Sequence, residues 1–253
     1  MIKISSADWE IDNIEAVLFD KDGTFIDLHY FWGKMTEMRA EEVIREFNLD
    51  GSLFGKICSF LGYNVNTQRM DPDGITALYS RAKIIEIFRG KLEELGVKTS
   101  EEKIAEIFDR VSLEFYKKID ECTKPINDAV DFIKKLRRLG VKIGIVTSDS
   151  VESTKLTLKN FKWEDLFDVV IGRESSSETK ESGIPTKMAL EKLEITSDKA
   201  IMIGDAPMDY ISAKNAGIEN TILVATGQVE ATELRKYSPL VVKTLKDVKC
   251  FKI

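Results

Sequence analysis

Asp20-Lys21-Asp22-Gly23-Thr24 follows directly on the apolar run Ala16-Val17-Leu18-Phe19. The apolar run is typical of a buried strand, and Gly23 lets the backbone turn sharply where that strand ends. Two carboxylates are therefore placed at the end of a rigid element. Asp-Gly is also a common turn dipeptide, so Asp20 alone could be a strand-end cap. The remaining motifs decide between these interpretations.

Composition limits what this acidic loop can belong to. The chain has 253 residues, of which 43% are hydrophobic and 32% charged, so it can bury one large core or two unequal ones. No apolar run approaches the roughly 20 residues that cross a bilayer, and the N-terminus carries no signal-peptide core. We therefore expect a cytoplasmic protein without a membrane partner.

Charge and cysteine usage exclude further classes. A net charge of −6 and a pI near 5.2 argue against a nucleic-acid partner, although a small anion could still be bound locally. Cys58, Cys122 and Cys250 are far apart and lack CxxC spacing, so neither disulfides nor a zinc site is indicated. The oligomeric state cannot be read from the sequence.

The chain divides into a discontinuous outer part and an inserted middle. From about Pro125 onward, helical and strand patterns alternate as βαβ units require, which predicts an α/β fold with a parallel sheet. The expected strands are 141–147, 169–171, 200–204, 221–224 and 240–242. Residues 27–124 show helical spacing of apolar residues instead, with a turn at Asp71-Pro72-Asp73-Gly74. We expect a core of residues 1–26 and 125–253, and a helical lid of residues 27–124.

A second acidic pair lies in Ile203-Gly204-Asp205-Ala206-Pro207-Met208-Asp209, again where an apolar strand gives way to a helix. The two carboxylates, four residues apart, can converge above the edge of the sheet where α/β proteins bind ligands. If both acidic pairs face one crevice, their charges require a cation, and all-oxygen ligands favour Mg²⁺. The alternative is that Asp209 caps its helix and Asp205 belongs to a turn.

Thr147 ends a third strand and is followed by Ser148-Asp149-Ser150 and a helix. A strand, a small polar turn and a helix N-terminus together form a ready anion site. The serines could equally be ordinary N-caps.

These residues, in this order, resemble the four motifs of the haloacid dehalogenase-like hydrolases. The resemblance covers about residues 15–225 and rests on Asp20-Lys21-Asp22-Gly23-Thr24, Thr147, a downstream lysine, and Gly204-Asp205 with Asp209. It implies a Rossmann-like core with a C1 helical cap inserted after the first strand, because the short stretch from Thr147 to Lys180 has no room for the other cap type. The run from Phe19 to Asp27 looks like the phosphoglycolate phosphatase-like branch.

The resemblance assigns the phosphate-binding lysine less directly. Lys180 has the expected spacing before Asp205, but the usual Lys-Pro pair is replaced by Lys180-Glu181, and the proline arrives at Pro185. Lys187 is therefore a rival, and either lysine could be a solvated surface residue.

The implied chemistry is a Mg²⁺-dependent phosphatase acting on a small phosphorylated metabolite, with phosphoglycolate as one candidate. Asp20 is the expected nucleophile, forming an aspartyl phosphate, and Asp22 the general acid and base. By resemblance, the metal is held by Asp20, the Asp22 backbone carbonyl, Asp205 and Asp209, the last directly or through water. Phosphate is bound by Thr147, Ser148 and the lysine.

Residues at the start of the lid are candidates for the substrate mouth. In one interpretation, His29 and Trp32 both touch the leaving group. In the alternative, His29 lies on the surface and Trp32 packs in the hinge. Arg81 and Lys83 could read a second anionic group, although each could be a solvated helix cation.

Four competing functions remain open. A dehalogenase needs the nucleophile but no metal, and Asp22 with Asp205 argues against it. A phosphomutase shares every core residue. A receiver-like signalling module would hold a phosphorylated aspartate without turnover, which the inserted lid disfavours. An inactive, repurposed member is the fourth alternative, although no core position is visibly lost.

Overall fold

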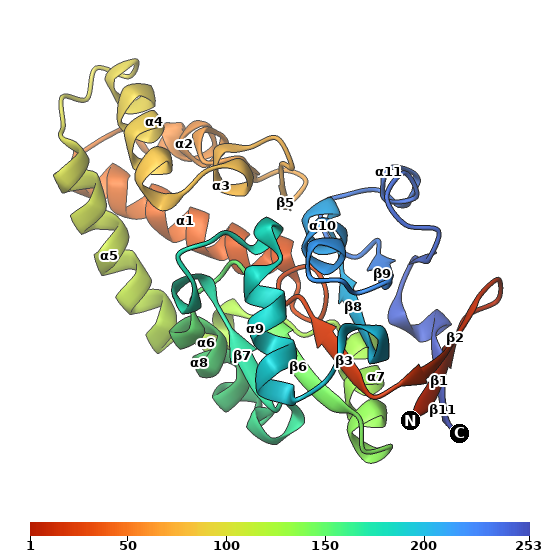
Figure 1. The fold of residues 1–253 in the computed structure, drawn as a ribbon. Helices are drawn as coiled ribbons and strands as arrows, with labels where there is room; N and C mark the ends of the chain where they lie inside the picture. Colours follow the sequence, from red (N-terminus) through yellow and green to blue (C-terminus); the bar gives the residue numbers. More distant parts are fainter. The chain divides into compact units, whose positions relative to one another are not determined.

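The computed structural model describes residues 1–253, which divide into two compact units. Residues Met1–Asp27 and Pro125–Ile253 form the first, here called the sheet unit, and Leu28–Lys124 form the second, the helical unit. Figure 1 shows that the helical unit is one continuous insertion in the chain of the sheet unit. No helix is both long enough and apolar enough to span a membrane.

The sheet unit is built on six parallel strands, as predicted. Their order across the sheet is β10 (Val241–Val242), β9 (Asn220–Val224), β8 (Ala200–Gly204), β3 (Ala16–Phe19), β6 (Lys142–Val146) and β7 (Val169–Ile171). Every residue of β3 and β8 is buried, as expected for strands that are covered on both faces. The α/β fold class predicted from the sequence is confirmed.

The acidic loop lies at the topological switch point of this sheet. From β3 the chain continues to β6 and β7 on one side, then returns to β8 on the other side of β3. Phe19 pairs with Ile145 of β6 and with Ile203 of β8, so Asp20 and Asp205 leave the sheet at the same edge. Ligands of open α/β sheets bind in the crevice at this point.

Helices cover both faces of the sheet (Figure 1). They are α7 (Asn127–Arg138), α8 (Val151–Phe161), α9 (Ile184–Leu193), α10 (Pro207–Asn215) and the short α11 (Ala231–Leu234). Apolar residues of α9 and α10, including Leu190 and Ala213, join Leu18 and Met202 in one buried cluster. The close fit of these two helices depends on Gly183, whose backbone lies against Asn215 at the end of α10.

A small antiparallel sheet that the sequence did not predict joins the two ends of the chain. It consists of β1 (Ile2–Ser5) between β2 (Glu10–Ile14) and β11 (Lys249–Lys252). Ile2 and Ile4 are buried in it and alternate with more exposed residues, which is the pattern of a strand with one covered face.

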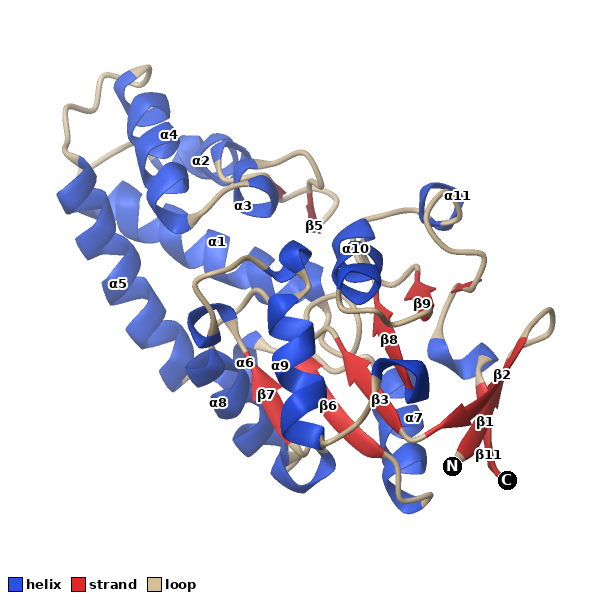
Figure 2. Cartoon of the chain, in the orientation of Figure 1, coloured by secondary structure: helices blue, strands red, loops and turns tan.

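The helical unit contains six α-helices, one 3-10 turn (Gly51–Leu53) and one short hairpin. Figure 2 shows that most of this unit is helical. The helices are α1 (Leu28–Glu46), α2 (Phe54–Phe60), α3 (Ile75–Leu78), α4 (Arg81–Glu93), α5 (Glu101–Lys117) and α6 (Ile119–Cys122), and the hairpin is β4 (Tyr63–Asn64) with β5 (Arg69–Met70). Ser80 and Ser100 cap α4 and α5 through their side chains. The turn at 71–74 connects β5 to α3.

Gly183 and Gly140 both have a positive φ, but only Gly183 has neighbouring backbone where a side chain would lie. A substitution at Gly140 therefore introduces conformational strain alone, and one at Gly183 introduces strain and steric overlap. Gly183 (φ 78°) would place a Cβ 2.6 Å from the backbone of Asn215, whereas Gly140 (φ 79°) has nothing within 4 Å of that position. We expect Gly140→Ala to lower the free energy of unfolding by about 1 kcal/mol and Gly183→Ala by about 2–4 kcal/mol. Urea unfolding measures both, and equal losses would contradict the proposed backbone overlap.

Candidate active site

Asp20 lies at the centre of the candidate site. Its backbone N–H donates to the Ile203 carbonyl (2.9 Å), which extends the β3–β8 ladder by one residue. Its carboxylate Oδ1 accepts a hydrogen bond from Lys180 Nζ at 2.6 Å. Since Asp20 is only 8% exposed, both its backbone and its side chain are held in place.

Lys180 bridges two of the predicted carboxylates. Its buried Nζ lies 2.6 Å from Asp20 Oδ1 and 2.6 Å from Asp209 Oδ1. It belongs to a 3-10 turn, Lys180–Ser182, that ends at Gly183. The rival Lys187 is exposed on α9 and makes no ion pair.

Asp209 has two roles in the structure. Its Oδ2 accepts a hydrogen bond from the Ala206 N–H (3.0 Å), which caps α10, while its Oδ1 faces Lys180. Asp209 therefore caps α10, and its other carboxylate oxygen contacts Lys180 beside Asp20. Asp205, at the end of β8, accepts a hydrogen bond from Thr24 Oγ1 at 3.3 Å.

Glycines leave the space that these carboxylates occupy. A Cβ at Gly23 or at Gly227 would overlap the Asp205 carboxylate, and one at Gly204 would overlap that of Asp209. Gly23 also needs its positive φ of 90°. The carboxylates thus sit in a recess lined by bare backbone.

Charge is not balanced in this recess. Burial raises the pKa of Asp205 well above its ordinary value, and the neighbouring Asp20 and Asp209 raise it further. Burial also raises the pKa of Asp209, to about 6, although Lys180 opposes this. Burial lowers the pKa of Lys180, but its two carboxylate partners outweigh that effect, so its pKa is raised overall and it stays charged. Three carboxylates facing one ammonium group leave two negative charges uncompensated when all are ionised.

The donor set suits a small divalent cation. Oxygens of Asp20, Asp205 and Asp209 all lie within 4.8 Å of one another, and all three residues are buried. Hard carboxylate oxygens are the ligands preferred by Mg²⁺, and the two uncompensated charges match its own.

Asp22 points to a different partner. Its Oδ1 lies 2.5 Å from the Nζ of Lys21, which also lies 3.1 Å from Asp149 Oδ2. Burial raises the pKa of Asp22 to about 6, against the opposing effect of Lys21. The loop itself is wound around one carbonyl, because the Lys21 oxygen accepts from the N–H groups of Thr24, Phe25 and Ile26.

The turn between β6 and α8 lies one strand away from Asp20. Thr147 Oγ1 accepts a hydrogen bond from the Asp149 N–H at 3.1 Å, so its own O–H remains a donor. Ser148 is exposed, with its Oγ 3.6 Å from Met208 Sδ. The N-cap of α8 is Ser150, whose Oγ accepts from the Ser153 N–H.

Comparisons of the sequence and of the fold with known proteins point to the same family. The sequence profile described as "Haloacid dehalogenase-like hydrolase" matches residues 66–224. The chain belongs to this family. It is therefore an enzyme of the haloacid dehalogenase-like hydrolase and phosphatase group.

Individual relatives are similar over most of their length. A PpaX protein of Caldanaerobacter subterraneus subsp. tengcongensis is 30% identical over 208 residues, covering 82% of this chain and 80% of the relative. Pyrophosphatase PpaX of Bacillus cereus strain Q1 is 27% identical, covering 76% of this chain and 88% of the relative.

The fold is shared with solved structures of low identity. One is a crystal structure of a predicted phosphoglycolate phosphatase from Haemophilus somnus 129PT, with a TM-score of 0.70, 14% identity, and coverage of 94% of this chain and 97% of that chain. Another is a subfamily IA hydrolase of the same superfamily from Geobacter sulfurreducens PCA, with a TM-score of 0.63, 16% identity, and coverage of 93% and 94%.

The candidate mouth residues of this hydrolase lie in the helical unit. His29 Nδ1 accepts a hydrogen bond from the Met70 N–H (3.0 Å), and Trp32 packs against the core of that unit. Arg81 is paired with Asp109 (2.6 Å) and Lys83 with Glu86 (2.6 Å).

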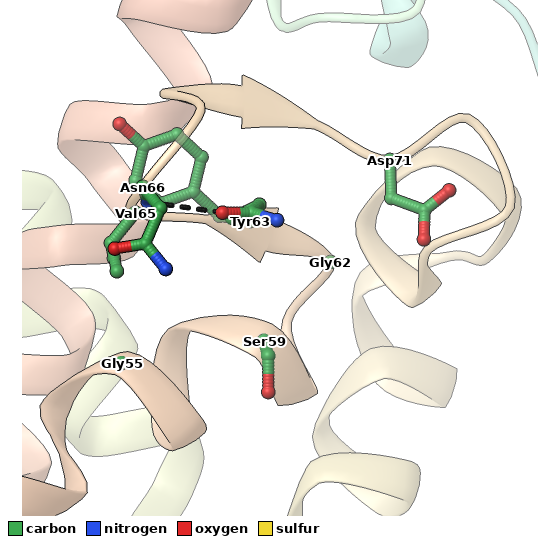
Figure 3. A pocket seen from close by; sticks show the side chains of 8 residues that line it. Gly55, Ser59, Gly62, Tyr63, Val65, Asn66 and Asp71 are labelled. Atoms are coloured by element: carbon green, nitrogen blue, oxygen red, sulfur yellow. Dashed lines mark hydrogen bonds between the residues drawn. The ribbon is translucent and has the colours of Figure 1, made fainter.

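A separate polar pocket lies within the helical unit (Figure 3). It measures about 330 Å³ and is lined by Gly55, Ser59, Gly62, Tyr63, Asn64, Val65, Asn66 and Asp71. The dashed line in Figure 3 is the hydrogen bond from the Asn66 N–H to the Asn64 side chain (3.0 Å). No lysine, arginine or histidine is among the residues that line this pocket, so its lining does not indicate a phosphate site.

Several residues at the site of the sheet unit were not predicted. Lys21 and Asp149 form a second ion-pair group, and Thr226 Oγ1 donates to the Gly23 carbonyl at 2.5 Å from the loop after β9. A signal existed for Thr226 and Gly227, because they directly follow a parallel strand whose end lies at the same edge. Nothing in the sequence showed that Lys21 is buried.

Metal binding should depend on pH in a defined direction. A carboxylate whose pKa is raised on folding, such as Asp209 (about 6 against an ordinary 3.8), destabilises the fold as pH rises between these two values. A divalent cation relieves that repulsion only where the carboxylates are ionised. We expect Mg²⁺ at about ten times its Kd to raise the Tm by a few degrees at pH 7.5 and by clearly less at pH 5.

Calorimetric scans at both pH values, with and without Mg²⁺, measure this difference. Asp205→Asn is the matched control and should lose most of the Mg²⁺ response at pH 7.5. Equal stabilisation at the two pH values would contradict the assignment of these carboxylates as ligands.

Proposed function

We propose that this enzyme is a Mg²⁺-dependent phosphatase that hydrolyses a small phosphorylated metabolite through an aspartyl phosphate on Asp20. The observation that carries the proposal is the buried group of Asp20, Asp205 and Asp209 against one lysine, Lys180. A carboxylate nucleophile that attacks an anionic phosphate needs positive charge around the phosphoryl oxygens. Lys180 supplies one positive charge, and a divalent cation bound by the carboxylates would supply the rest.

Asp20 is the proposed nucleophile. One of its carboxylate oxygens forms a bond to phosphorus while the bond to the leaving oxygen breaks, and Asp22 supplies the proton that the leaving group takes. A water molecule then attacks the phosphorus of the aspartyl phosphate and gives its proton to Asp22. The Asp20–phosphorus bond breaks, which returns the Asp20 carboxylate and releases phosphate.

The other residues bind and orient. Asp20, Asp205, Asp209 and the Asp22 backbone carbonyl are the proposed ligands of Mg²⁺, which when bound supplies positive charge to the transferring phosphoryl group. Lys180 positions the Asp20 carboxylate and adds a second positive charge. Thr147, through its free O–H, and Ser148 are the proposed donors to the phosphoryl oxygens.

The helical unit, in this proposal, is the cap that selects the substrate. Its His29 and Trp32 remain candidates for the mouth. Phosphoglycolate is one candidate substrate, and inorganic pyrophosphate is a second, favoured by the relatives that carry the name pyrophosphatase PpaX. A phosphomutase would use the same core, so release of free phosphate must be measured directly.

Asp20 provides the first test. We expect Asp20→Asn to lower phosphate release by at least about 10³-fold, because an amide is not a nucleophile at phosphorus. A panel of phosphorylated metabolites and pyrophosphate, assayed with and without a chelator, measures this. Activity that survives either the substitution or removal of divalent cations would refute the mechanism.

Leaving-group chemistry tests the role of Asp22. Phenolate is a more basic leaving group than p-nitrophenolate, so hydrolysis of phenyl phosphate depends far more on protonation of the departing oxygen. The two esters differ only by the nitro group. We expect Asp22→Asn to lower kcat/KM for phenyl phosphate by about 10²-fold or more, and for p-nitrophenyl phosphate by much less. Equal losses on the two esters would show that Asp22 is not the general acid.

A further inference from the structure

Lys21 is a buried charge inside the catalytic loop. Its side chain is 0% exposed, although it stands in the chain between the two acidic residues Asp20 and Asp22. Its ammonium group contacts Asp22 Oδ1 at 2.5 Å and Asp149 Oδ2 at 3.1 Å, two carboxylates from different turns of the sheet unit.

Stability alone does not explain a lysine at this position. Burying an ammonium group and two carboxylates carries a large desolvation cost, and replacing such a group with apolar residues is often neutral or stabilising. The position follows a fully buried apolar strand, where an apolar side chain would be the simpler choice. A buried ion pair does, however, fix the orientation of its members.

Asp149 is a rigid anchor for the lysine. Its Oδ1 accepts from the Ser150 N–H (2.7 Å), its N–H donates to Thr147 Oγ1 (3.1 Å), and its carbonyl accepts from the Arg173 N–H (2.9 Å). The backbone and the carboxylate of Asp149 are therefore both held in place on the turn that follows β6. Lys21 lies in the loop that directly follows β3, and its buried ammonium group is held against Asp149, so it has little freedom to move.

We propose that Lys21, anchored on Asp149, is a positioning residue that holds the Asp22 carboxyl group by Oδ1 and so presents Oδ2 for proton exchange with the leaving group. This inference rests on the proposed phosphatase function. The Lys21 contact is the only side-chain hydrogen bond recorded for the Asp22 carboxyl group, so removing it frees that group to rotate. The ion pairs of Lys21 are with Asp22 and Asp149, so its proposed effect on catalysis is exerted through Asp22.

The test compares Lys21→Met with wild type on phenyl phosphate and p-nitrophenyl phosphate. Methionine keeps the length of the side chain and removes its charge. We expect kcat/KM to fall about 10- to 100-fold for phenyl phosphate and less than about 3-fold for p-nitrophenyl phosphate, because only the first ester depends on a well-placed proton. Equal losses on both esters would overturn the proposal.

A double-mutant cycle separates action through Asp22 from direct action on the phosphate. In an Asp22→Asn background, we expect Lys21→Met to have no further effect on phenyl phosphate, because the group that it positions is already inactive. Multiplicative losses would show that Lys21 acts independently of Asp22, which contradicts the proposal.

Asp149→Asn is a second variant in case Lys21→Met does not fold, since it keeps the shape of the anchor and removes its charge. It should show the same selective loss on phenyl phosphate, to a smaller degree. Lys199→Met is the matched control, because Lys199 pairs with Glu15 on a partly exposed surface of the same unit and should leave both rates unchanged.

Failure of this inference can be told from failure of the proposed function. If wild type releases no phosphate from either ester or from any member of the metabolite panel, the phosphatase function is refuted. If wild type and the Asp22→Asn variant behave as expected but Lys21→Met and Asp149→Asn both lose activity equally on the two esters, or lose none, only the positioning role is refuted.

Discussion

The structure of the site depends on one constraint, which is that three carboxylates are buried together with too little positive charge. Asp20, Asp205 and Asp209 converge at the edge of the parallel sheet, and Lys180 bridges two of them. Such a group is unfavourable without a cation, because burial and mutual repulsion both oppose ionisation. The raised pKa values of Asp205 and Asp209 express that cost. The charge of this recess is therefore suited to a divalent cation.

The rest of the sheet unit holds this group in place. β3 and β8 are adjacent and in register, so the two acidic motifs leave the sheet side by side although 185 positions separate Asp20 from Asp205 in the chain. Glycines at 23, 204 and 227 provide space where any side chain would collide with a carboxylate. Asp209 is fixed at the start of α10 because it also caps that helix. The ion-pair group of Lys21, Asp22 and Asp149 adds a second charged layer beside the first.

Much of this arrangement could be predicted from the sequence, for identifiable reasons. Apolar runs that end in acidic or hydroxyl residues predicted the parallel strands, and parallel strands bring their ends to one edge. In the three-stranded sheet, the pairing of β1 with β11 joins the two ends of the chain, which no local pattern shows. The pairing of β1 with β2 is local and was overlooked because both strands are short. The spacing favoured Lys180 over Lys187, but only the structure shows that Lys180 is buried between Asp20 and Asp209. The burial of Lys21 could not be predicted either, because a lysine in a loop is normally solvated.

The central claim is that Asp20 accepts the phosphoryl group. The most direct measurement is to quench the enzyme in acid during turnover of p-nitrophenyl phosphate with Mg²⁺ present, digest it, and locate the added phosphoryl mass by tandem mass spectrometry. The account predicts the label on Asp20 in wild type, in an acyl linkage that hydroxylamine cleaves. A label on Ser148, Thr147 or another residue, or turnover without any labelled residue, would contradict it.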